Sequence, residues 1–441
     1  MKQSLSILVL IFLFGACTFV QERYSKLPPG PYRGVLKLEN TFVSPNPKGE
    51  PLPEKVDLVF DEVTDGELPF TFEVEYENDS IFKLTIINGE ERIPVPSKNI
   101  SYGRDRSQGR DTLRIDFPVY DTYISAYHEE NIIEGVWVVN YRDNYRVPFV
   151  AEFGQNHRFT KLRKEPITDM SGDWAMNFSE GDEPFVGLGE FRQEGNELTG
   201  TIRTETGDYR YLEGTIQADK FYLSVFDGSH AFLFEGKLSE DGSRMAGSFR
   251  SGRHYITDFS GRRDPNFVLA DPDTLTSIDQ REPLEFSFPN ANGDSISLSD
   301  PRFQDKVTLV SIMGTWCPNC RDEANYLREY RAANPDQDFE IISLAYERYG
   351  ATDARSVAAI QRYEDNMNID WPILLAGSSG KSEAAKTLPA LNHVLSYPTL
   401  IFLDKEGKVR RIHTGFNGPA TSAFAEFDTE FRETMDELLA E

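Results

Sequence analysis

The alternation of apolar and polar residues along the middle of the chain is the feature that most limits its fold. Between about residues 30 and 263, segments such as Phe70–Tyr76 and Phe82–Ile86 alternate with a period of two. This period places one face of a strand on a core and the other in water. Turn sequences typical of hairpins, for example Asn88-Gly89, recur between such segments. The sequence therefore predicts antiparallel β-rich meanders that form barrels or sandwiches.

A faint internal repeat divides this β-rich part into two. The segments Leu113–Asp121 and Phe221–Asp227 each end in Asp, and each precedes a segment that carries Gly and an aromatic residue. We therefore expect one β-rich module over residues 30–165 and a second, with a lipocalin-like meander, over residues 168–263. A single larger barrel is the competing layout.

The β-rich part shows no grouping of residues typical of a catalytic or metal site. Its histidines are too far apart in the sequence for a metal-binding pair; they are His128, His157, His230 and His254. Its many acidic residues are interpreted as the solvated faces of strands. We expect neither a metal ion nor a cofactor in this protein.

The pattern changes after residue 263. Residues 264–283 contain three prolines and little periodicity, and we expect a linker there. Strands and helices then alternate, which predicts an α/β domain over residues 284–441 with a sheet covered on both faces. Strands are expected at 284–288, 295–298, 307–313, 339–345, 371–375, 399–403 and 409–413, and helices at about 317–334, 353–368, 382–391 and 422–439.

The sequence Cys317-Pro-Asn-Cys320 lies where a predicted strand meets a predicted helix. Two cysteines three residues apart at a helix start lie on one side of its first turn, close enough for a disulfide. The helix N-terminus lowers the pKa of the first thiol, and an accessible thiolate is the attacking species in disulfide exchange. A structural zinc site would need four ligands, and the sequence contains no second such pair. We interpret Cys317 and Cys320 as a redox-active pair.

Residues 284–441 resemble the thioredoxin superfamily, in particular the TlpA/ResA-like extracytoplasmic thiol-disulfide oxidoreductases. The resemblance rests on Phe286-Ser-Phe288 with the following Asn292-Gly-Asp294 turn, on Trp316–Cys320, and on Tyr397-Pro398-Thr399. It implies a thioredoxin-like fold for this domain.

The resemblance also assigns roles to site residues. It implies that Pro398 follows a cis peptide bond and faces the dithiol, although an ordinary trans turn remains an alternative. Tyr397 would offer main-chain hydrogen bonds to a bound cysteine peptide, and the Trp316 ring would flank the site. Glu323 matches the acid that these proteins keep beside the dithiol, where it would tune the second thiol or relay protons. The buried acid of thioredoxin itself is replaced here by Ser311.

Three functions are compared. In the first, a thiol-disulfide oxidoreductase, Cys317 attacks a disulfide and Cys320 resolves the mixed disulfide. The second, a peroxidase of the peroxiredoxin type, needs Thr three residues before its Cys, whereas Thr315 stands two before Cys317, and Val310 replaces the required Pro. The third is a surface ligand-binding lipoprotein in which the β-rich half has the main role.

We interpret the N-terminus as a targeting segment. Lys2 precedes an apolar run, Leu5–Phe14, which is too short for a span that needs about 20 residues. Small residues then precede Cys17, and the segment resembles the lipobox of bacterial lipoproteins, with Phe14 in the position of Leu. The resemblance implies a signal peptide over residues 1–16, acylation of Cys17, and a tether over residues 17–29. A plain secretory signal is the alternative.

Charge and targeting together indicate the partners and the location. The chain has 72 Asp and Glu against 46 Lys and Arg, a net charge of −26, and phosphate would be repelled, so nucleic acid is not an expected partner. We expect a disulfide-containing protein substrate, a membrane thiol electron donor and a lipid anchor. The expected location is the bacterial cell envelope, facing the periplasm.

Overall fold

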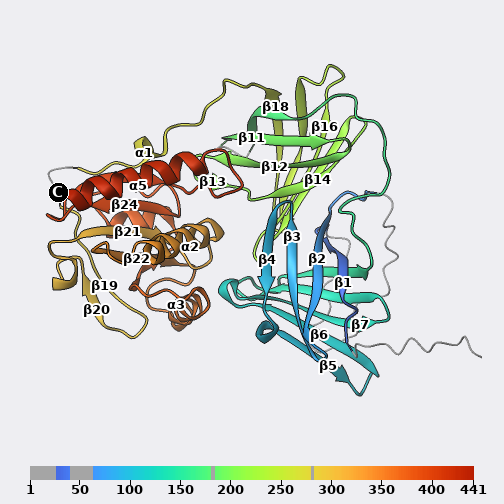
Figure 1. The fold of residues 1–441 in the computed structure, drawn as a ribbon, viewed down its shortest axis with the longest axis horizontal. Helices are drawn as coiled ribbons and strands as arrows, with labels where there is room; N and C mark the ends of the chain where they lie inside the picture. The colour runs from blue at the N-terminus through green and yellow to red at the C-terminus, as the bar shows by residue number, and fades with distance from the viewer. Residues whose placement is uncertain (1–25, 40–62, 180–183, 280–282) are drawn as a thin grey trace, which may run out of the picture.

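The computed structural model describes residues 26–39, 63–179, 184–279 and 283–441. In sequence order these form two nine-stranded antiparallel sheets and a C-terminal α/β domain, which lies beside both sheets (Figure 1). The predicted signal peptide 1–16 and the predicted acylation site Cys17 lie outside the described residues, as does most of the predicted tether 17–29. None of the described helices is long and apolar enough to cross a membrane.

The first module is a sheet with the strand order β4-β3-β2-β1-β9-β8-β7-β6-β5. In β3, Phe82, Leu84 and Ile86 are buried and alternate with more exposed residues, as the period of two predicts. Its elements are β1 (Gly30–Lys37), β2 (Glu67–Asn78), β3 (Ile81–Asn88), β4 (Glu91–Val95), η1 (Ser97–Asn99), β5 (Ile100–Asp105), β6 (Arg110–Phe117), η2 (Pro118–Tyr120), β7 (Thr122–Glu129), β8 (Ile132–Val139) and β9 (Arg146–Phe153).

The second module is an antiparallel meander that closes on itself. Its strand order is β11-β10-β18-β17-β16-β15-β14-β12-β13, and an additional pairing of β11 with β12 closes the sheet into a barrel. Aromatic side chains such as Phe178 and Phe234 fill the barrel. The strands are β10 (Gly172–Ser179), β11 (Phe185–Glu194), β12 (Glu197–Thr204), β13 (Gly207–Asp208), β14 (Leu212–Gln217), β15 (Lys220–Phe226), β16 (Ala231–Leu238), β17 (Arg244–Ser251) and β18 (Tyr255–Arg263). The chain therefore builds two sheets rather than one larger barrel.

The two β-modules share a hydrophobic core. Phe226 of β15 packs on Phe70 and Trp137 of the first module, with ring centroids 4.5 and 5.4 Å apart. Arg158, in the connection between the modules, donates hydrogen bonds of 2.9 Å to Ser224 Oγ in one and to Asn88 Oδ1 in the other. We call the two modules together the β-rich half.

The C-terminal domain is built on a five-stranded sheet with the order β23-β22-β21-β24-β25. Strands β21 to β23 are parallel, and β24 and β25 are antiparallel to their neighbours. Its elements are β19 (Ser287–Pro289), β20 (Ser295–Ser297), η3 (Pro301–Phe303), β21 (Val307–Met313), α2 (Pro318–Ala333), β22 (Phe339–Glu347), α3 (Ala354–Met367), β23 (Ile373–Ser378), α4 (Lys381–Thr387), β24 (Thr399–Leu403), β25 (Val409–Thr414) and α5 (Phe424–Ala440). Tyr326 of α2 packs on Phe431 of α5, with ring centroids 5.0 Å apart.

The segment expected to be a linker, 264–283, contains some regular structure. Helix α1 (Pro272–Leu275) lies within it. Asp273 accepts hydrogen bonds from Arg411 and shares one with His413, at 2.6 and 2.8 Å, and both partners belong to β25. Ile278 forms a β-bridge with Leu391. These contacts attach Asp273 and Ile278 to the C-terminal domain, and Pro272 marks the start of the short helix.

Candidate active site

The two cysteines lie at the junction of β21 and α2. Cys317 is the N-cap of α2, and its Sγ accepts a hydrogen bond of 3.2 Å from the backbone N–H of Cys320. The two residues form a disulfide, with their Cα atoms 5.2 Å apart. Both are largely buried, with 6% of Cys317 and 1% of Cys320 exposed. The free N–H groups of a helix start favour a thiolate at the first position, as the sequence predicts.

The loop before β24 faces this disulfide. The Tyr397-Pro398 peptide bond is cis, as the resemblance implies, and not the trans alternative. The carbonyl oxygen of Tyr397 lies 3.3 Å from Cys317 Sγ. The Trp316 ring packs against the Tyr397 ring with centroids 5.6 Å apart, and its Nε1–H donates to the Tyr346 carbonyl at 2.9 Å. The structure therefore brings Trp316, Tyr397 and Pro398 together around the dithiol.

Glu323 lies on helix α2 and is buried inside the C-terminal domain. It is 1% exposed, and its Oε2 accepts a hydrogen bond of 2.6 Å from Ser311 Oγ in β21. Its Oε1 is buried without a hydrogen-bond partner among the described residues. Burial raises the pKa of Glu323 to about 8, against the opposing effect of the Ser311 hydrogen bond. The carboxyl thus holds a proton near neutral pH, three residues along the helix from Cys320, where residues share a face.

The sequence analysis missed one acidic residue of this site. Glu347, at the end of β22, is 2% exposed. It accepts hydrogen bonds of 2.9 Å from both the N–H and the Oγ1 of Thr315, just before Trp316. Burial raises the pKa of Glu347. The signal available in the sequence was an acidic residue, Glu347, at the end of an apolar run. In the structure this run is β22, which pairs in parallel with β21, the strand that leads to the cysteines.

In the described part of the chain, no three or more His, Cys, Asp or Glu side chains gather in an arrangement that could hold a metal ion. The site consists of a dithiol, a buried carboxyl on its helix, a cis-proline loop and a flanking indole. This set can exchange a disulfide for two thiols and can accept or supply the accompanying proton.

Comparison with known proteins agrees with this geometry. The Redoxin family matches residues 260–429, which include the whole site. The C-terminal domain is a TlpA/ResA-like member of the thioredoxin superfamily. The thioredoxin-like protein YneN of Bacillus subtilis (strain 168) is 28% identical over 132 residues, which are 30% of this chain and 68% of YneN.

Two further proteins show similarity over comparable lengths. The thiol-disulfide oxidoreductase ResA of Bacillus subtilis (strain 168) is 24% identical over 165 residues, which are 37% of this chain and 72% of ResA. The solved structure of a thiol-disulfide oxidoreductase from Bacteroides fragilis NCTC 9343 covers 33% of this chain and 96% of its own, with 21% identity and a TM-score of 0.26.

Proposed function

We propose that this thiol-disulfide oxidoreductase is tethered to a membrane of the bacterial cell envelope and works there as a reductase of protein disulfides. The observation that carries the chemistry is the Cys317–Cys320 disulfide at a helix start, with the carbonyl of Tyr397 beside Cys317 Sγ. The family supports the class of reaction. The reducing direction and the tether rest on the resemblance and on the N-terminal sequence.

The reaction begins with the reduced pair. The Cys317 thiolate attacks one sulfur of a substrate disulfide, a bond forms between Cys317 and that sulfur, and the other substrate sulfur leaves as a thiolate. Cys320 then attacks Cys317 Sγ, which breaks the mixed disulfide and releases the second substrate thiolate. The substrate gains two electrons, and the enzyme is left as the Cys317–Cys320 disulfide. A thiol donor at the membrane restores the dithiol.

Two groups assist these steps. The N–H of Cys320 points at Cys317 Sγ and stabilises the thiolate that attacks the substrate disulfide. Glu323, when it has lost its proton, accepts the proton of Cys320 as that thiol attacks.

The experiment is insulin-disulfide reduction by the full chain. The Cys317→Ser variant is expected to lose turnover, while a Cys17→Ser variant keeps it and moves from the membrane fraction to the soluble fraction. Insulin turnover by Cys317→Ser at the rate of the unmodified protein would refute the assignment. Peroxide consumption by the reduced protein that is faster than insulin reduction would favour the peroxidase instead.

A further inference from the structure

A short segment of the second module lies against the dithiol face of the C-terminal domain. Ser396, directly before the cis-proline loop, donates a hydrogen bond of 2.9 Å from its Oγ to the Thr206 carbonyl. Gly207 is so close to Asn319, which stands between the two cysteines, that a Cβ atom at this glycine would collide with the Asn319 side chain. The segment 204–208 therefore occupies space directly beside the dithiol and its docking loop.

The first module also contacts residues close to the dithiol. Arg321, the residue after Cys320, donates a hydrogen bond of 3.2 Å to the Tyr120 hydroxyl. The Arg348 guanidinium lies 4.4 Å from the centre of the Tyr141 ring and 4.7 Å from that of the Trp316 ring. Cation–π contacts of this kind connect the flanking indole to the β-rich half.

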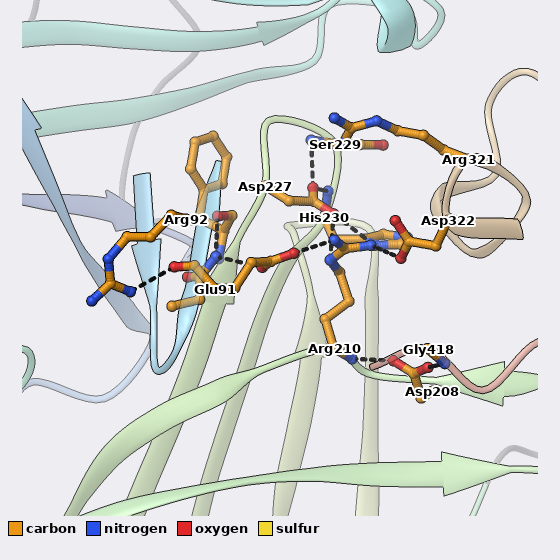
Figure 2. Close-up of polar contacts among 12 residues, drawn as sticks. Glu91, Arg92, Asp208, Arg210, Asp227, Ser229, His230, Arg321, Asp322 and Gly418 are labelled. Carbon is orange, nitrogen blue, oxygen red and sulfur yellow. Dashed lines mark hydrogen bonds and ion pairs between the residues drawn. The ribbon is translucent and has the colours of Figure 1, made fainter. Parts of the chain in front are cut away.

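Arg210 joins all three parts of the protein at this junction (Figure 2). Its guanidinium forms ion pairs with Glu91 of the first module, Asp227 of the second and Asp322 of helix α2. The Arg210 side chain is 6% exposed. Nearby, Asp208 accepts a hydrogen bond of 2.6 Å from the Gly418 N–H of the C-terminal domain. Asp322 stands two residues after Cys320, so this hub is attached to the first turn of the helix that carries Cys320.

The junction differs from the contact between the two β-modules. Those modules share one buried core, whereas every fully buried member of the C-terminal core that the structure describes lies at residue 284 or later. Among the residues that the structure describes, only Val119, partly buried, packs against both that core and the core of the β-rich half. The described contacts between the C-terminal domain and the β-rich half are therefore mainly hydrogen bonds, ion pairs and cation–π contacts, beside the packing of η2 against α3. Separation at this junction would leave each core intact, as in a hinge motion between domains.

We propose that the β-rich half is a built-in cover for the dithiol, and that a protein disulfide reaches Cys317 only after the two halves separate at this junction. The inference rests on the proposed function, because it concerns access to the same sulfurs. Substrate main chain must align beside Tyr397, and the segment 204–208 is hydrogen-bonded to the residue before it, Ser396. The cover selects substrates by size, so that compact small disulfides react in the closed arrangement more readily than proteins do.

The test weakens contacts across the junction without changing the dithiol. The double variant Asp322→Asn/Glu190→Gln removes one charge that faces Arg210 and one that accepts hydrogen bonds from the N–H and Oγ of Ser422, at 3.0 and 2.6 Å. The matched control is Glu340→Gln/Asp428→Asn, because these acids pair only with residues of the C-terminal domain in the interactions described. Thermal unfolding verifies that both variants fold.

Two measurements decide the proposal. The rate of insulin reduction relative to that of a small aromatic disulfide is expected to rise about tenfold in the junction variant and to stay unchanged in the control. In the reduced protein, a polyethylene-glycol maleimide should label Cys317 far more slowly than N-ethylmaleimide does. In the junction variant, the difference between these two labelling rates should become much smaller.

The outcomes separate this inference from the proposed function. If neither disulfide is reduced by any form of the protein, the proposed function fails, and the labelling rates alone decide whether a cover exists. Equal labelling of the unmodified protein by the two maleimides, after correction for their rates on the unfolded chain, would overturn the cover. An unchanged ratio of insulin to small-disulfide reduction in a folded junction variant would overturn it as well.

Discussion

Replacing Glu323 by Gln should stabilise the C-terminal domain, and the gain should grow with pH. The pKa of this carboxyl rises from 4.5 to about 8 because burial penalises its charged form. Above pH 4.5 the unfolded chain releases the proton, while the native domain keeps it until about pH 8. The native state therefore binds more protons than the unfolded state in this window, and the free energy of unfolding falls as pH rises.

The magnitude follows from the width of the window. Each pH unit lowers the free energy of unfolding by about 1.4 kcal/mol, so the loss between pH 4.5 and pH 7 is about 3 kcal/mol. The Glu323→Gln variant has no proton to lose and should escape this loss. Its side chain keeps nearly the same shape, so packing around Ser311 changes little. The difference in stability between the two proteins should level off above about pH 8.

A local probe is needed because the chain has several domains and need not unfold in one step. Pulsed hydrogen exchange on peptides from β21 and β22 during urea unfolding, at several pH values from 4.5 to 8.5, reports the stability of this domain. Glu329→Gln, an exposed acid on the same helix, serves as the control and should follow the unmodified protein. Parallel pH profiles for the unmodified protein and Glu323→Gln would refute the reasoning.

Three further changes test other parts of the structure. Glu347→Ala leaves the N–H and hydroxyl of Thr315 without their acceptor, should destabilise the domain by about 2–4 kcal/mol, and should speed hydrogen exchange at the loop before the cysteines. Arg158→Met leaves several buried acceptors unpaired and should lower the stability of the β-rich half by about 3–5 kcal/mol in calorimetry, whereas the exposed Arg163→Met changes it by less than about 1 kcal/mol. Phe178→Ala opens a cavity in the barrel and should lower its stability by about 3–5 kcal/mol, and an unchanged melting temperature would contradict the packing described here.

Local patterns in the sequence predicted many of the strands and helices. The apolar runs at 307–313 and 399–403 became β21 and β24 with the same bounds, because a strand buried on both faces is apolar throughout. The strand expected at 284–288 is shorter, and only Ser287–Pro289 pairs as β19. The helix expected at 382–391 ends at Thr387. Element ends depend on neighbours that a local pattern does not contain.

The site was predicted where its residues are neighbours in the sequence or stand in a familiar motif. Cys317, Cys320 and Trp316 are contiguous with one helix start, and Pro398 stands in a motif that the resemblance identified. Glu347 reaches Thr315 only through the pairing of β21 with β22. Two of the three acids that pair with Arg210, Glu91 and Asp322, are more than one hundred positions from it, so no periodicity or spacing in the sequence predicts this cluster.

The core shared by the two β-modules determines where this protein can be divided. Phe226 belongs to the second module in sequence but is packed by rings of the first. A cut between residues 153 and 172 would leave apolar surface on both products and favour their aggregation. A cut after Arg263 would instead follow a boundary that is already polar. The β-rich half is thus a single unit for expression, although its strands form two sheets.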